Sequence, residues 1–116
     1  MQLDEYGKQA ISTLMYGHDN HAYGQLDAQL MAQVLGLVGE SGEVAEKFKK
    51  ILRDKAGELS DDDRKELVKE LGDILWYVNA VAVLLGSDIE TVAKANLEKV
   101  LSRKSRGVIQ GSGDNR

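Results

Sequence analysis

Apolar residues recur along the chain at the three- and four-residue spacing of amphipathic helices, in four separate stretches. No stretch alternates between apolar and polar residues with the period of two that a strand requires. The chain also contains no proline, which fits long uninterrupted helices. We expect an all-α fold with helices over residues 3–15, from 27 to between 53 and 57, 60–85 and 87–106.

Residues suited to cap helices support these boundaries. Asp27 is a plausible N-cap for the second helix, and Ser60 with Asp63 resembles a capping box at the start of the third. Ser87 with Glu90 forms a better capping box for the fourth helix. The long second and third helices should pack through two apolar stripes, formed by Leu30, Val34, Leu37, Ser41, Val44, Ala45, Phe48 and Leu52, and by Leu67, Leu71, Ile74, Val78, Val81 and Leu85.

The third helix is more apolar than one core requires. At 100° per residue, Trp76 and Val83 point almost opposite to the stripe that contains Leu67. A helix that is apolar on most sides is buried on most sides. We therefore expect a second copy of the chain to cover Trp76 and Val83, so that dimerisation completes a four-helix-bundle-like fold.

The chain length of 116 residues suits a single domain, which we place over residues 1–106. Residues 107–116 are polar and rich in glycine, which predicts a flexible C-terminal tail. Residues 17–24 predict an irregular loop between the first two helices. That loop holds His18 and His21, to which the sequence assigns no role.

Composition excludes several classes of protein. The absence of cysteine removes disulfides, thiolate nucleophiles and metal sites that need sulfur. A net charge of −4 argues against duplex nucleic acid as a partner, because such binding needs a concentrated basic face. No apolar run is long enough to span a membrane, and the N-terminus does not look like a signal peptide. We expect a cytoplasmic protein with no membrane partner.

Two acid-x-x-acid pairs lie on successive predicted helices: Glu40 with Glu43, and Glu70 with Asp73. A spacing of three places both carboxylates about 60° apart on one side of a helix, where one cation can touch both. Neighbouring antiparallel helices could bring all four acids together. Four converging carboxylates need a compensating cation, and sites built from carboxylate oxygen suit Mg²⁺, Mn²⁺ or Ca²⁺. The other interpretation is that the acids form an ordinary solvated helix surface.

Glycines accompany these acids. Gly36, Gly39, Gly42 and Gly72 lie inside predicted helices, where each costs up to about 1 kcal/mol relative to alanine. Such a cost commonly reflects the close approach of a backbone or a ligand. Packing between helices alone would also explain them.

The stretches GLVGESGEVAEKFKK (36–50) and KELGDILWYV (69–78) resemble the MazG-type all-α nucleoside triphosphate pyrophosphohydrolases. The signature of that family is E-x-x-E, a spacer, and then E-x-x-D. The resemblance continues through Asn96, Lys99 and Arg103 of the fourth predicted helix. It implies a dimer or a dimer of dimers and hydrolysis of a nucleoside triphosphate to monophosphate and pyrophosphate. It also implies Mg²⁺, with Mn²⁺ as an alternative, held by Glu40, Glu43, Glu70 and Asp73.

This chemistry predicts positive and aromatic side chains beyond the metal. Lys47 lies one turn after Glu43 and is suited either to a phosphate or to an ion pair with that glutamate. With the family resemblance, Asn96, Lys99 and Arg103 become candidate substrate ligands, and Tyr77 lies on the same side of its helix as Glu70 and Asp73. The base and sugar stay open. The alternatives are a dUTPase-like or dCTPase-like specialist of the same superfamily, and a helical interaction module without enzymatic activity.

Overall fold

A computed structural model describes residues 1–15 and 25–116, which form four helices and, within those ranges, no strand. The helices are α1 (Leu3–Ile11), α2 (Ala28–Lys55), α3 (Asp61–Leu84) and α4 (Ile89–Arg106). The all-α prediction is confirmed. His18, His21 and the predicted loop 17–24 lie outside the described residues. None of the described helices is long and apolar enough to cross a membrane.

Most helix starts follow the predicted caps. The side chain of Asp27 accepts a hydrogen bond from the Leu30 amide, and Ser60 forms a reciprocal capping box with Asp63. The prediction of Ser87 as the cap of the fourth helix was wrong. Asp88 caps α4 instead, with its carboxylate 2.8 Å from the amide nitrogen of Thr91.

The first helix ends at Ile11, four residues before its predicted end at residue 15. The hydroxyl of Ser12 donates to the carbonyl of Gln9, and the hydroxyl of Thr13 donates to that of Ala10. Such local side-chain bonds compete with the helical ladder and explain the early stop.

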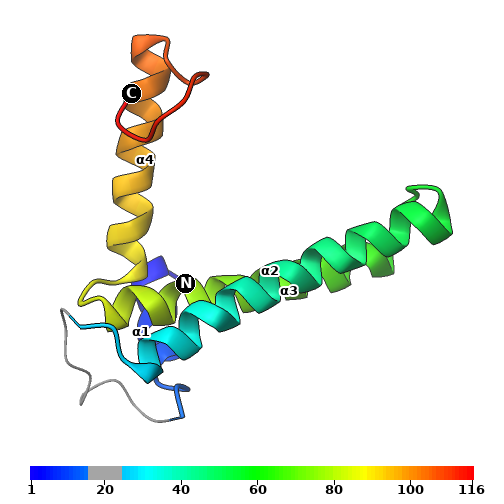
Figure 1. The fold of residues 1–116 in the computed structure, drawn as a ribbon, viewed down its shortest axis with the longest axis horizontal. Coiled ribbons are helices and arrows are strands. Elements are labelled where there is room, and N and C mark those ends of the chain that lie inside the picture. Colours follow the sequence, from blue (N-terminus) through cyan, green and yellow to red (C-terminus); the bar gives the residue numbers. More distant parts are fainter. Residues whose placement is uncertain (16–24) are drawn as a thin grey trace.

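The two long helices form an antiparallel hairpin, and α1 packs against α3 near the open end of that hairpin (Figure 1). The fourth helix turns away from the hairpin: it contacts α1 and α3 but, among the described residues, not α2. The radius of gyration is 17.1 Å, whereas about 13 Å is typical of a compact domain of this length. A single copy is therefore extended.

Trp76 and Val83 are partly buried against the segment of the same chain that contains α1, and their cover by a second copy stays a prediction. Both side chains pack against a buried cluster of Ile11, Leu14 and Ala80. The indole nitrogen of Trp76 also donates to the Ala10 carbonyl at 3.2 Å and to the Thr13 hydroxyl at 2.9 Å. The extra apolar side of α3 thus serves to dock the first helix.

Four large residues predicted to face the core are exposed in a single copy: Phe48, Leu52, Leu71 and Leu85. The smaller Ser41 and Ala45 are exposed as well. Among the described residues, no third helix lies along the far half of the hairpin, because α1 is short and α4 points elsewhere. The buried contacts between α2 and α3 follow a narrower line through Leu30, Ile51 and Leu67 instead.

A second apolar stripe runs along the hairpin beside this buried line. Met31, Leu52 and Val68 directly follow the buried Leu30, Ile51 and Leu67, about 100° further round each helix. All members of the stripe are between 37% and 71% exposed. Antiparallel helices turn in opposite senses when viewed from one end. A step of one residue along the chain from the buried line therefore leads to the same side of the hairpin on α2 and on α3. We call this side the bare face; it consists of Met31, Leu35, Val38, Leu52, Val68, Leu71 and Leu75.

Candidate metal and nucleotide site

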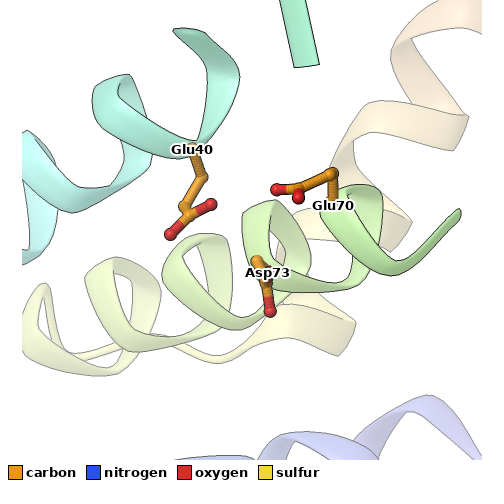
Figure 2. A group of neighbouring side chains, drawn as sticks. All are labelled: Glu40, Glu70 and Asp73. Atoms are coloured by element: carbon orange, nitrogen blue, oxygen red, sulfur yellow. The ribbon is translucent and has the colours of Figure 1, made fainter. Parts of the chain in front are cut away.

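Three of the four predicted acids come together between α2 and α3. One carboxylate oxygen from each of Glu40, Glu70 and Asp73 lies within 4.8 Å of the other two. Figure 2 shows Glu40 on α2 and Glu70 on α3 extending toward each other, with Asp73 on the next turn of α3. At 100° per residue, Glu40 lies about 80° round the helix from Leu30, and Asp73 lies about 120° from Leu67. Both displacements run in the sense opposite to that of the bare face, so the cluster lies on the other side of the hairpin.

Glu43, the fourth predicted acid, does not join this group. It is exposed on α2, one turn after Glu40. Its charge still contributes to the potential at the Glu40 carboxylate. In the described structure, Glu43 is therefore a neighbour of the cluster and not a member of it.

The acids of the cluster destabilise the ionised form of one another by electrostatic repulsion. Partial burial, and then the charges of Asp73, Glu70 and Glu43, raise the pKa of Glu40 above its usual range. Three carboxylate oxygens at this separation form an all-oxygen donor set whose negative charge one lysine compensates only in part. That donor set fits a hard divalent cation such as Mg²⁺ or Mn²⁺.

Lys47 of α2 forms an ion pair with one acid of the cluster. Its ammonium nitrogen lies 2.8 Å from Glu70 Oε1 and 3.8 Å from Glu66 Oε2. The ion pair expected from sequence joined Lys47 to Glu43 within α2; the observed pairs instead cross to α3. The hydrogen bond to Glu70 is the main cause that raises the pKa of Lys47.

Tyr77 lies beside the acids as predicted, and Gly36 makes room for it. A Cβ atom at position 36 would lie 2.2 Å from Cε1 of the tyrosine ring. Tyr77 and Trp76 meet edge to face with ring centres 5.0 Å apart. Together with Glu40 and Asp73, they line an open hollow of about 340 Å³, which brings aromatic surface next to carboxylate oxygen.

The close approach expected at the helical glycines holds only for Gly36. At Gly39, Gly42 and Gly72, an added Cβ atom would meet no atom of the described residues within 4 Å. Packing within the described part of a single copy therefore does not explain those three glycines.

No role at the site was predicted for Tyr6 from the sequence. Burial and then the charge of Asp73 raise the pKa of its phenol, which places the Tyr6 side chain of α1 within the electrostatic reach of the acids. No spacing rule in the sequence could have found this, because α1 meets α3 only through the tertiary fold.

Asn96, Lys99 and Arg103 do not reach the acid cluster within one copy, because they lie on α4, which makes no contact with α2. Lys99 Nζ is instead 2.9 Å from Asp114 Oδ1, and Arg103 is nearly buried beside the same carboxylate. The residues after α4 form no helix and fold back along it (Figure 1). Their flexibility in solution stays a prediction.

Comparison with known proteins identifies the family. A family model described as the MazG nucleotide pyrophosphohydrolase domain matches residues 29–108, a range that includes all four acids and all of α4. The chain is also similar to the Gene 37 protein of Mycobacterium phage L5, with 48% identity over 118 aligned residues that cover both chains in full. No solved structure matches significantly.

Proposed function

The chain belongs to the MazG nucleotide pyrophosphohydrolase family, and from this premise we propose that it hydrolyses a nucleoside triphosphate, normal or aberrant, to nucleoside monophosphate and pyrophosphate in the presence of Mg²⁺. The observation that carries the proposal is the convergence of Glu40, Glu70 and Asp73 from two helices. Cleavage between the α- and β-phosphates needs charge neutralisation, a water molecule in line with the α-phosphorus and stabilisation of the leaving pyrophosphate.

Glu40, Glu70 and Asp73 would hold the divalent cation, with Glu43 one turn away to bind a further ion or a water molecule of its shell. When bound, Mg²⁺ or Mn²⁺ neutralises phosphate charge and polarises the bond that breaks. One of the four carboxylates accepts the proton of the attacking water. The acids of this chain thus position the nucleophile on one side of the α-phosphorus.

The hollow lined by Trp76 and Tyr77 lies next to the acids and would receive the nucleoside. Aromatic rings accept the face or edge of a base without selecting it by hydrogen bonds. Lys47 would turn from Glu70 toward the phosphates once a cation neutralises that glutamate. Asn96, Lys99 and Arg103 would bind phosphate only if another copy brings α4 to the acids.

A panel of nucleoside triphosphates tests the activity. With Mg²⁺ the protein should release pyrophosphate and monophosphate from at least one of them, and EDTA should stop the release. One dominant substrate would identify a specialist such as a dUTPase-like or dCTPase-like enzyme. Orthophosphate as the sole phosphate product, or no product from any triphosphate, would contradict the proposal.

We also propose that two copies associate through the bare face. Apolar residues repeat there at alternating steps of four and three, as Met31, Leu35 and Val38 do on α2, which is the spacing of helices that pack side by side. Gly42 and Gly72 leave open space next to this stripe, which would let another backbone approach closely. Pairing of two hairpins makes a four-helix bundle and leaves the acid cluster open on the outer side of each hairpin.

Light scattering tests this association. The parent protein should have a mass of at least twice 12.7 kDa at micromolar concentration. Leu71→Lys places a charge in the bare face and should lower the mass toward that of one chain, whereas Leu26→Lys, at an exposed position outside the helices, should not. A monomeric parent protein would contradict the proposal.

A further inference from the structure

The C-terminal residues 107–116 close a polar loop over α4. Asp114 lies at its centre: Oδ1 is 2.9 Å from Lys99 Nζ and 3.1 Å from a terminal nitrogen of Arg103, which also donates to the Asp114 carbonyl. One carboxylate thus bridges two cations that lie one turn apart on α4. We call Lys99, Arg103 and Asp114 the clasp.

The side chain of Arg103 is buried in this arrangement, which is unusual for an arginine on a terminal helix. Its side chain is 10% exposed, and its Nε atom is buried without a hydrogen-bond partner. Arginine is seldom buried without full pairing, because the guanidinium group has five donors to satisfy. The guanidinium therefore has donor capacity that Asp114 does not use.

Polar contacts hold the rest of the loop. The guanidinium of Arg116 donates to the carbonyls of Val108, Ile109 and Gly113, while Arg106 donates to the carbonyl of Arg116. The loop contributes no buried apolar residue to the core. Segments with few buried apolar contacts open at low free-energy cost, so this loop can leave α4 without unfolding the hairpin.

We propose that the C-terminal loop is an intramolecular competitor for an anion site: Asp114 occupies the position on Lys99 and Arg103 that a phosphate group of a nucleotide or of pyrophosphate takes when the loop opens. This inference rests on the proposed role of Lys99 and Arg103 as phosphate ligands. A carboxylate is the side-chain group closest to a phosphate in charge and in acceptor geometry, and arginine binds either group through paired donors.

The loop lies almost wholly outside the family match, which ends at residue 108, so Asp114 and Arg116 are not part of the matched domain. Opening of the clasp would expose a partly enclosed Arg103 with Lys99 beside it. The loop therefore sets how strongly α4 binds an oxyanion, and the affinity is reduced by the fraction of time that the loop is closed.

Binding of inorganic pyrophosphate to the full chain in EDTA tests the clasp separately from catalysis, because without a cation the acid cluster repels the anion. Asp114→Asn should tighten binding by isothermal titration calorimetry, about tenfold if the loop is closed in about nine molecules of ten. A chain that ends at Ile109 keeps the cap of α4 and should gain at least as much. Lys99→Met in the Asp114→Asn background should remove the gain.

Glu98→Gln is the matched control, since it removes the same charge from an exposed position adjacent to Lys99. It should leave pyrophosphate affinity near that of the parent protein. Unchanged affinity in both Asp114→Asn and the shortened chain would overturn the clasp even if the protein hydrolyses nucleotides. A gain in those variants without hydrolysis of any nucleotide would support the clasp and contradict the proposed function.

Discussion

Lys47 on α2 and Glu70 on α3 form an ion pair across the hairpin, with 2.8 Å between Nζ and Oε1. The side chain of Glu70 is 16% exposed and belongs to the acid cluster. A lysine thus supplies positive charge to a group of carboxylates whose geometry fits a divalent cation. Lys47 also has a second carboxylate within reach, since Glu66 Oε2 lies 3.8 Å from its ammonium nitrogen.

Removal of this lysine should make the fold depend more strongly on metal. In EDTA, Lys47→Met should melt a few degrees below the parent protein, because the acids then repel without a counter-charge. Mg²⁺ should raise its melting temperature more than that of the parent. Lys49→Met is the control, since Lys49 pairs with Glu46 on the surface of α2. Equal responses of both variants to Mg²⁺ would contradict a special role for Lys47.

Glu40 gives a pH-dependent test of the same repulsion. Its pKa in the folded state is raised above the ordinary value of 4.5, so folding disfavours its charge wherever it is ionised in both states. The penalty is complete above the raised pKa and disappears as pH falls through it toward the unfolded value. In EDTA, Glu40→Gln should therefore be more stable than the parent at pH 7, and this advantage should shrink toward about pH 4. A difference in melting temperature that does not change with pH would contradict the repulsion.

Substitution of a proposed metal ligand and substitution of a nearby surface acid should have different effects on turnover. Asp73→Asn removes one oxygen ligand and should lower turnover roughly a hundredfold or more, because the metal supplies most of the charge stabilisation. Glu46→Gln should leave turnover unchanged, since Glu46 pairs with Lys49 and Lys50 and is not part of the cluster. Steady-state kinetics at saturating Mg²⁺ would measure both. Equal losses would contradict the assignment of the cluster as the metal site.

Replacement of two glycines of α2 by alanine should change the free energy of unfolding in opposite directions. Gly36→Ala pushes a methyl group into the ring of Tyr77 and should cost about 1 to 3 kcal/mol of unfolding free energy, as overpacking does. Gly39→Ala meets open space and should gain up to about 1 kcal/mol from helix propensity. Urea unfolding would measure both. A stable Gly36→Ala variant would show that Tyr77 is free to move away from α2.

The local parts of this structure could be predicted from the sequence. Asp27 and Ser60 start their helices because their side chains satisfy free amide groups of the first turn. Glu40, Glu70 and Asp73 converge because two long helices joined by a short turn must lie antiparallel, and spacing of three keeps each pair of acids on one side.

The tertiary features could not be predicted, because they depend on directions that no periodicity encodes. Gly86 takes a positive φ of 79° between α3 and α4, and the chain then leaves the hairpin, which separates Lys99 and Arg103 from the acids. The cover of Trp76 by α1 and the proximity of Tyr6 to Asp73 likewise arise from docking of a short helix. The apolar surplus of α3 correctly indicated a further packing partner, and α1 of the same chain takes part of that role.

The most direct test of the central claim is hydrolysis of the preferred nucleoside triphosphate in ¹⁸O-labelled water with Mg²⁺, followed by mass spectrometry of both products. The account predicts ¹⁸O in the nucleoside monophosphate and none in the pyrophosphate, because water attacks the α-phosphorus. The label should disappear from the products when Asp73→Asn replaces the parent, since little hydrolysis then occurs. Label found in pyrophosphate, or in orthophosphate released with a nucleoside diphosphate, would contradict the account.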